Sequence, residues 1–182
     1  MKNKYFSIKD IALMAVFGCV SSLVTLTTAF IPAPLPGLYA IIAIPVGTIL
    51  ILTVVEMVGK FGAATFTQLV SGGLSMFLPG GPPVVWIIIP GWCISGLFID
   101  SILYLSKKKP SESRLLTITV GLVYNVPGDF LIYWSFVAFL GWEYSLFFFL
   151  YGFLLIHMIL GGIAGIFISD IIRKIKPILL SI

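Results

Sequence analysis

The sequence predicts an all-α membrane protein with six transmembrane helices, and three observations support this fold class. Of its 182 residues, 59% are hydrophobic and 10% are charged, whereas soluble domains contain roughly 25% charged residues. The mean hydropathy is +1.14, and a soluble surface tolerates only small apolar patches, so the excess needs contact with lipid. Six apolar runs are also long enough to cross about 30 Å of hydrocarbon as helices.

The predicted spans follow one another through short connections and form a single integral membrane domain, residues 1–182. Their expected bounds are Ile8–Phe30, Leu38–Val58, Gly62–Leu78, Val84–Leu105, Leu115–Leu140 and Tyr144–Ser169. The first is longer than the apolar region of a cleavable signal peptide, and no A-x-A site follows it, so we expect it to remain as a span. The third carries many polar side chains, so we expect it to face protein rather than lipid.

The distribution of basic residues predicts the orientation of the chain. All 11 Lys and Arg lie in four places: residues 2–9, Lys60, 107–114 and 173–176. The alternate connections contain none of them: Pro32–Gly37, Pro79–Pro83 and Gly141–Glu143. By the positive-inside rule we expect both termini in the cytoplasm and a multi-pass protein in the cell membrane. The dispersed basic residues form no recognition motif, so no nucleic-acid partner is expected.

Motifs for catalysis and nucleotide hydrolysis are absent from the sequence. No G-x-x-x-x-G-K-[ST] motif occurs, so a P-loop for ATP is excluded. The single histidine excludes H-E-x-x-H, and no G-x-S-x-G motif for a nucleophilic serine occurs. Cys19 and Cys93 lie inside apolar runs, without the spacing of a zinc site. We therefore expect no enzyme activity, metal or cofactor in this chain.

Polar residues in the fifth predicted span are the main candidates for a ligand site. Asn125, Asp129 and Tyr133 are spaced by four residues and so share one helix face. We expect Asp129 to lie roughly 15 Å below the outer end of this helix, where an unpaired carboxylate is costly. Its candidate partners are His157 of the sixth span and a cationic or hydrogen-bonding ligand. The alternative is a buried network that only holds helices together.

Two prolines and several aromatic residues extend this candidate site. Pro90 and Pro127 each remove a helical hydrogen bond, so we expect a bend in both spans, either beside a pocket or as an ordinary kink. With the Pro- and Gly-rich outer connections, these bends predict a pocket that opens outward and is covered by loops. Trp86, Tyr133 and Trp134 are candidates for stacking on a ligand, although an aromatic belt at the membrane surface explains some of them.

Small residues form stripes on two of the predicted spans. Gly161, Gly165 and Ser169 repeat a small-x-x-x-small pattern, which favours close packing within this chain. The stripe on the first span is a candidate for docking a partner membrane subunit, with packing inside the chain as the alternative. Its residues are Ala12, Ala15, Gly18, Cys19 and Ser22.

Charged residues near the basic ends of the helices have the spacing of surface ion pairs. Glu56 precedes Lys60 by four residues, and Asp170 precedes Arg173 and Lys174 by three and four. We expect these pairs to lie on the surface rather than in a site. The sequence indicates no partner for Asp100, which is expected to pack near a cytoplasmic helix end.

Six short helices with cytoplasmic termini, a small-residue first helix and an outward pocket together resemble the S component of energy-coupling factor (ECF) vitamin transporters. The local match lies in residues 60–64 (KFGAA), 78–83 (LPGGPP) and 84–91 (VVWIIIPG). These are similar to the third helix, outer loop and fourth helix of the branch for thiamine or its hydroxymethylpyrimidine precursor. For the Ala-x-x-x-Ala scaffold contact of that family, this chain has Ala15 with Cys19 and Gly18 with Ser22.

The resemblance implies a division of labour between subunits. The S component captures a vitamin from outside, while an ECF scaffold transmembrane subunit and two ATPase subunits supply the energy. This arrangement accounts for the missing P-loop. Two other classes remain open: an ion-coupled transporter that works alone, and a membrane enzyme or accessory protein without a small ligand.

Charge narrows the expected ligand. The outer connections hold no Lys or Arg, so anionic vitamins are disfavoured, because a buried carboxylate needs a cation or several donors. A carboxylate with aromatic residues favours a cationic or neutral heteroaromatic ring. Thiamine fits best, and its pyrimidine precursor, riboflavin and other neutral heterocycles stay open. The expected binding residues are Asp129 for the amine or cationic group, Asn125 and His157 for hydrogen bonds, Trp86, Tyr133 and Trp134 for stacking, and Gln68 for the floor.

Overall fold

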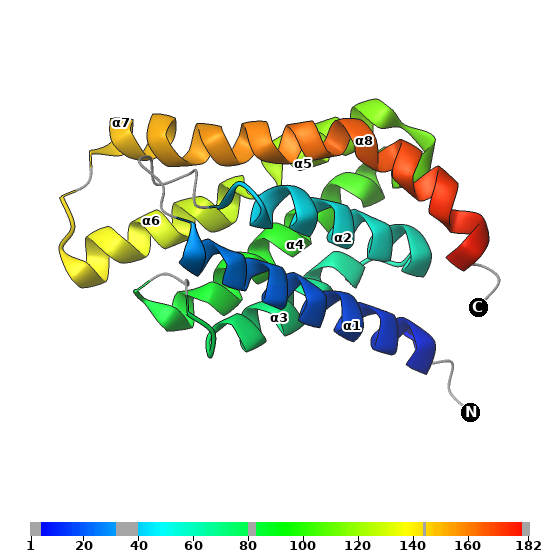
Figure 1. Ribbon diagram of the computed structural model, residues 1–182, viewed down its shortest axis with the longest axis horizontal. Helices are drawn as coiled ribbons and strands as arrows, with labels where there is room; N and C mark the ends of the chain where they lie inside the picture. The colour runs from blue at the N-terminus through cyan, green and yellow to red at the C-terminus, as the bar shows by residue number, and fades with distance from the viewer. Residues whose placement is uncertain (1–4, 32–39, 80–82, 144, 180–182) are drawn as a thin grey trace.

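The computed structural model describes residues 5–31, 40–79, 83–143 and 145–179, and the regular elements of this part of the chain are all helices (Figure 1). Four stretches are long and apolar enough to cross a membrane: Ile8–Phe30, Val85–Ser106, Arg114–Leu140 and Leu146–Ile175. A further helix, Ala43–Val58, is apolar but shorter. The all-helical prediction is therefore confirmed for the described residues, together with four of the six predicted spans as candidates by length and composition.

The first helix, α1 (Ile8–Thr25), begins at a capping box and continues into a 3-10 turn, η1 (Leu26–Phe30). The Ser7 hydroxyl accepts from the Asp10 backbone N–H at 3.1 Å, and the Asp10 carboxylate accepts from the Ser7 N–H at 2.8 Å. Large apolar side chains cover the outward face of α1, including Leu23, which is 61% exposed. Such a face suits a lipid environment and is rare on soluble monomers.

The centre of the bundle is α2 (Ala43–Val58), in which every residue from 51 to 56 is buried. It ends at Gly59, whose left-handed φ of 62° is the usual conformation of a glycine after a helix. The next helix, α3 (Ala63–Ser75), packs between α1 and α4 (Ile88–Ser106). The polar third span thus faces protein on two sides, as its composition predicts.

The start of α3 is held by a carboxylate from α4. Asp100 is 3% exposed. It accepts from the backbone N–H groups of Ala64 at 3.1 Å and Thr65 at 2.9 Å, and from the Thr65 hydroxyl at 2.7 Å. A carboxylate in this position satisfies N–H groups that have no partner inside the helix, and the helix dipole favours its charge. Asp100 therefore fixes α3 against α4.

Pro90 begins a helix instead of bending one. A 3-10 turn, η3 (Val85–Ile87), leads into α4, and Pro90 lies in the first turn of α4. N–H groups in a first turn have no partner within the helix, so proline is tolerated there at little cost. The bend expected inside the fourth span is replaced by this change from 3-10 to α-helix.

Pro127 divides the predicted fifth span into two helices. α5 (Arg114–Val123) ends before Tyr124, and α6 (Val126–Leu140) begins one residue before Pro127. The proline has no N–H to donate to the carbonyl of Val123, so the α-helix is interrupted between these segments. The break expected here is confirmed.

The predicted sixth span contains a π-helical turn near its start. α7 (Leu146–Phe149) passes through this turn, η5 (Leu150–Leu154), into α8 (Leu155–Leu179). The start of α1 and the end of α8 lie at the same end of the bundle, whereas α7 lies at the opposite end (Figure 1). An arrangement of this kind requires an even number of crossings from one end to the other.

The small-residue stripe of α8 packs within the chain. A Cβ atom on Gly161 would overlap the carbonyl oxygen of Gly121 in α5, and one on Gly165 would overlap the carbonyl oxygen of Thr117. The Thr117 hydroxyl also donates to the Gly165 carbonyl at 2.7 Å. Because the two backbones touch, only glycine fits at the crossing.

Gly161→Ala is expected to destabilise the protein, although alanine is the better helix former by about 1 kcal/mol. The new methyl group has to push α5 away, and overpacking of this kind costs about 1–3 kcal/mol. The measurement is the thermal unfolding midpoint in detergent. Gly73→Ala is the matched control, because a Cβ at Gly73 meets no atom within 4 Å. Equal midpoints for the two variants would contradict the close crossing.

Contacts between distant segments bring the basic residues to one end of the bundle, which we call the basic end. Lys60 pairs with Asp10 of α1 at 2.6 Å. Glu56 is 6% exposed and accepts from the Ser111 N–H at 3.1 Å and hydroxyl at 2.8 Å. Arg173 of α8 donates to the Ser111 carbonyl at 2.9 Å. The starts of α1 and α5 and the ends of α2 and α8 therefore meet here.

These contacts correct the ion pairs expected from helical spacing. Lys60 follows the left-handed turn at Gly59 and so leaves the helix face that carries Glu56. Its ion pair is formed with Asp10 instead. Asp170 is exposed, and in the described part of the chain it forms no ion pair with Arg173 or Lys174. Spacing along one helix misses the Lys60 pair because its partner lies in α1, and it misses the contact of Arg173 because Ser111 lies in another segment.

Candidate functional site

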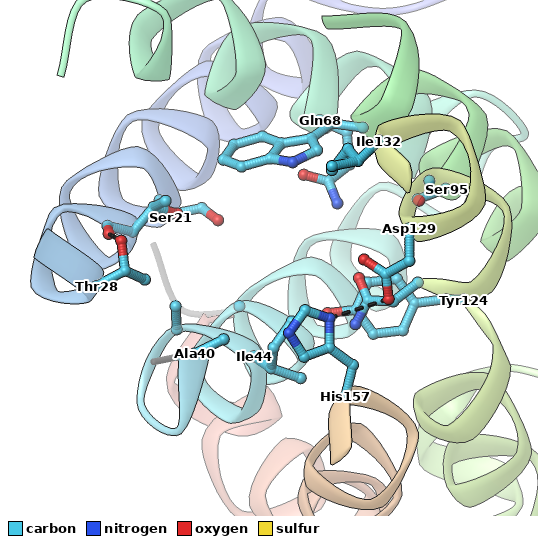
Figure 2. A pocket seen from close by; sticks show the side chains of 16 residues that line it. Ser21, Thr28, Ala40, Ile44, Gln68, Ser95, Tyr124, Asp129, Ile132 and His157 are labelled. Atoms are coloured by element: carbon cyan, nitrogen blue, oxygen red, sulfur yellow. Dashed lines mark hydrogen bonds and ion pairs between the residues drawn. The ribbon is translucent and has the colours of Figure 1, made fainter. Parts of the chain in front are cut away.

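A cavity of about 100 Å³ lies inside the bundle where α5 gives way to α6. Figure 2 shows that its wall comes from segments far apart in the sequence. We call it the polar cavity. Side chains on its wall that can form hydrogen bonds include Ser21, Thr28, Gln68, Ser95, Asn125, Asp129 and His157. None of its lining residues is Lys or Arg within the described ranges.

The polar cavity lies toward the end of the bundle opposite the basic end. Its wall includes Thr28 from η1 and Ala40, which precedes α2. These residues lie beyond the last turn of α1 and before the first turn of α2, away from the contacts of the basic end. The loops expected to cover the site, Pro32–Gly37 and most of Pro79–Pro83, lie outside the described residues.

Asp129 and His157 form a buried pair on the wall of the polar cavity. The His157 Nδ1 atom lies 2.9 Å from Asp129 Oδ2, and the two residues are 3% and 6% exposed, respectively. When Asp129 is ionised its carboxylate only accepts, and Nδ1 then donates in this contact. Asp129 lies in the first turn of α6, where the helix dipole favours a negative charge. The partner predicted for Asp129 within the chain is therefore the one observed (Figure 2).

Asn125 supplies a donor beside this pair. It precedes the first residue of α6, and its Nδ2 atom is buried without a hydrogen-bond partner among the described residues. A buried donor without a partner costs about 1–3 kcal/mol. In a cavity with room for a small molecule, such a group points to a ligand or a water molecule as the missing acceptor.

Tyr124 is fixed next to Asn125 at the break between α5 and α6. It is 3% exposed, and its hydroxyl lies 3.0 Å from Oγ1 of Thr48 in α2. This contact ties the break to the central helix. The break is thus a defined backbone conformation that aims both Asn125 and Asp129 into the polar cavity.

Trp92 and Gln68 contribute another part of the wall. Both line the polar cavity, and Figure 2 shows Gln68 beside the open space. Trp92 is half-buried. Among the described residues it is the tryptophan that lines this wall. Sequence reasoning missed Trp92. The available signal was its spacing from Ser95 and Ile99, which places all three on one helix face.

The aromatic residues predicted to stack on a ligand lie outside the polar cavity. Tyr133 stacks on Phe149 with ring centroids 4.4 Å apart. Trp86 and Trp134 are both 52% exposed. Each lies edge to face with Phe139, with ring centroids 5.3 and 5.6 Å apart, respectively. Tyr133 is one turn beyond Asp129, and the wall of the cavity ends near Ile132. The exposed tryptophans match the alternative of a membrane-surface belt.

The small-residue stripe of α1 is divided between two environments. Gly18 packs on α3, where a Cβ would lie 2.8 Å from the Thr67 carbonyl oxygen, and the Ser22 hydroxyl lies 3.0 Å from that of Ser75. Cys19 is exposed, as is Ala12, and Ala15 is half-buried. Packing inside the chain therefore accounts for Gly18 and Ser22. Ala12 and Cys19 face outward, and Ala15 is partly accessible between them.

The polar cavity offers a carboxylate acceptor, an amide donor and an aromatic surface, which suit reversible binding of a small polar ring. Groups of three or more His, Cys, Asp or Glu that could hold a metal do not occur in the described residues. No known protein family matches the chain, and comparisons with curated proteins and with solved structures find no match.

Proposed function

We propose that this chain is the substrate-binding subunit of an ECF-type vitamin importer and binds a heteroaromatic amine in the polar cavity. The observation that carries the proposal is the buried Asp129 carboxylate beside the donor of Asn125, which has no hydrogen-bond partner in the described part of the chain. Polar groups at membrane depth are costly, so their convergence on a cavity indicates a binding role. The sequence resemblance to S components supports the same assignment.

In this proposal all six spans predicted from the sequence cross the membrane, with both termini in the cytoplasm. α5 and α6 together form the fifth span, and α7 and α8 together form the sixth. The basic end is then the cytoplasmic end, in keeping with the positive-inside rule. The polar cavity opens toward the other side, from which the ligand enters. α2 and α3 are short for a span. α2 packs against α1 and α8, and α3 packs between α1 and α4, which reduces their contact with lipid.

The size of the polar cavity limits its ligand to one ring, and its chemistry favours an aromatic amine. A cavity of roughly 150 Å³ admits benzene, so a cavity of about 100 Å³ has to widen by about half to hold one aromatic ring. An aminopyrimidine presents an exocyclic N–H to Asp129, a ring nitrogen to the Asn125 amide and a flat face to Trp92. We therefore assign the site to hydroxymethylpyrimidine or to the pyrimidine half of thiamine.

Transport energy comes from other subunits in this proposal. The chain has no P-loop, so ATP would be used by two ATPase subunits that act through a scaffold membrane subunit. The accessible part of the α1 stripe, Ala12, Ala15 and Cys19, is the surface we assign to the scaffold contact. Small side chains there allow close approach of another helix.

The buried Asp129 and His157 pair favours a second candidate, an ion-coupled transporter that acts alone. Carboxylates and histidines at membrane depth are common in proton relays. Uptake of the ligand by proteoliposomes that contain only this chain, driven by a pH gradient, would support this second candidate. Uptake that requires ATPase subunits supports the first.

A thermal-unfolding screen of the purified protein tests the proposed function. We expect thiamine or hydroxymethylpyrimidine to raise the unfolding midpoint, because a ligand at 100 times its Kd adds about 2.7 kcal/mol. Biotin, pantothenate and folate serve as the anionic controls and are expected to leave it unchanged. Stabilisation by an anionic vitamin alone, or by none of the compounds, would contradict the proposal.

A further inference from the structure

A second cavity lies at the basic end, between the end of α2 and the end of α4. Its volume is about 140 Å³, and Lys60, Lys108 and Lys109 contribute to its wall. We call it the basic cavity. It shares no lining residue with the polar cavity, so an occupant here is independent of the vitamin site.

Two of the three lysines on this wall have no acidic partner in the described part of the chain. Lys60 pairs with Asp10, and the other ion pair found there is that of His157 with Asp129. Glu112 accepts from the backbone N–H of Lys109 at 2.9 Å but forms no ion pair with its ammonium group. The ammonium groups of Lys108 and Lys109 therefore remain available to an anion.

The carboxylate on this wall does not neutralise the lysines. Asp100 is 3% exposed, and its two oxygens accept from Ala64 and Thr65 at the start of α3. Those donors and the helix dipole stabilise its negative charge but do not cancel it. Lys60 is paired with Asp10, so Lys108 and Lys109 outnumber this one carboxylate and the net charge of the wall is positive.

The turn that leads to Lys108 adopts an unusual backbone conformation. Lys107 has a φ of 54°, and it is the non-glycine residue with a positive φ in the described ranges. Glycine is the usual residue at such a helix end, because a residue with a Cβ atom is strained there. This turn reverses the chain after α4, so that Lys108 and Lys109 reach the wall beside the α2 end.

The remaining wall of the basic cavity is aromatic and open to the outside of the bundle. The rings of Phe61 and Tyr104 lie edge to face, 5.7 Å apart, and are 43% and 70% exposed. Leu105, the next residue, is 77% exposed. These residues lie at the end of a candidate span, at the level where headgroups meet hydrocarbon. A small soluble anion would gain nothing from contact with these apolar side chains, whereas acyl chains would pack against them.

We propose that the basic cavity binds the headgroup of an anionic phospholipid. The phosphate contacts Lys108 and Lys109, and the acyl chains pass over Phe61 and Tyr104 toward the bilayer. Basic pockets between membrane helices recognise such headgroups, and lysines near an anionic surface strengthen the attraction. The lipid thereby bridges the α2 end and the connection between α4 and α5.

Native mass spectrometry of the full chain in detergent tests this proposal, with dioleoyl-phosphatidylglycerol and dioleoyl-phosphatidylcholine as probes. We expect the first phosphatidylglycerol to bind at least about tenfold more tightly than phosphatidylcholine, and K108Q/K109Q to abolish this preference. K9Q/K174Q is the matched control, because it removes the same charge from exposed lysines outside the cavity wall. It is expected to keep the preference.

Three outcomes would overturn the lipid assignment. The first is equal affinity for the two lipids, and the second is an equal loss in both double variants, which indicates general charge attraction. The third is displacement of the lipid by inorganic phosphate or glycerol 3-phosphate, which indicates a site for a free phosphate. Vitamin binding measured on the same K108Q/K109Q protein is expected to be unchanged, so failure here is separable from failure of the proposed function.

Discussion

Asp129→Asn is expected to weaken binding of hydroxymethylpyrimidine at least tenfold, about 1.4 kcal/mol. The amide keeps the shape of the side chain but loses the charge-assisted hydrogen bond to the ligand amine. It also weakens the contact with His157, which lies 2.9 Å away, and so loosens the pair that lines the cavity. The measurement is the ratio of Kd values from calorimetric titration in nanodiscs.

Glu143→Gln is the matched control for this substitution. It removes the same charge from an exposed side chain in a connection opposite the basic end, so it reports any long-range effect of charge on ligand binding. We expect its Kd to stay within about twofold of wild type, because exposed charges are screened by salt. If Asp129→Asn behaves like Glu143→Gln, the carboxylate does not contact the ligand.

Trp92→Ala is expected to weaken binding by a comparable amount. Stacking of a base on an aromatic side chain contributes about 1–3 kcal/mol, and Trp92 supplies the tryptophan ring on the wall of the polar cavity. Trp92→Phe retains an aromatic face and should recover part of the affinity. Trp86→Ala is the matched control, because Trp86 is 52% exposed and lies outside the cavity wall.

Trp86 is the stacking residue predicted from the sequence, and Trp92 is the one that lines the polar cavity in the structure. The two alanine variants distinguish between them. A loss of affinity in Trp86→Ala with wild-type affinity in Trp92→Ala would return the stacking role to Trp86. Unfolding midpoints without ligand serve as the folding control for each variant. A variant that unfolds early but retains the wild-type Kd shows that the side chain supports the fold alone.

The polar part of the site was predictable because polar groups are rare at membrane depth. Asn125, Asp129, His157 and Gln68 all stand out in apolar runs, and the structure brings all four to one cavity. The break at Pro127 was predictable from the residue type alone. Proline has no N–H to donate to the carbonyl four residues earlier, so it interrupts an α-helix. These features depend on local chemistry, which the sequence contains.

The aromatic wall and the contacts of the basic end were not predictable in this way. Aromatic residues are frequent along the chain, so composition cannot distinguish Trp92 in the cavity from Trp86 and Trp134 on the surface. The Lys60 and Asp10 pair joins residues 50 positions apart, and helical spacing detects only partners within one helix. Both features depend on how distant helices pack.

Calorimetric titration of the wild-type chain with hydroxymethylpyrimidine in nanodiscs decides whether the polar cavity is a pyrimidine site. We expect saturable binding with one ligand per chain and competition by thiamine, because both present the same aminopyrimidine to Asp129 and Asn125. Binding of biotin at the same site, or the absence of saturable binding by either pyrimidine compound, would contradict it.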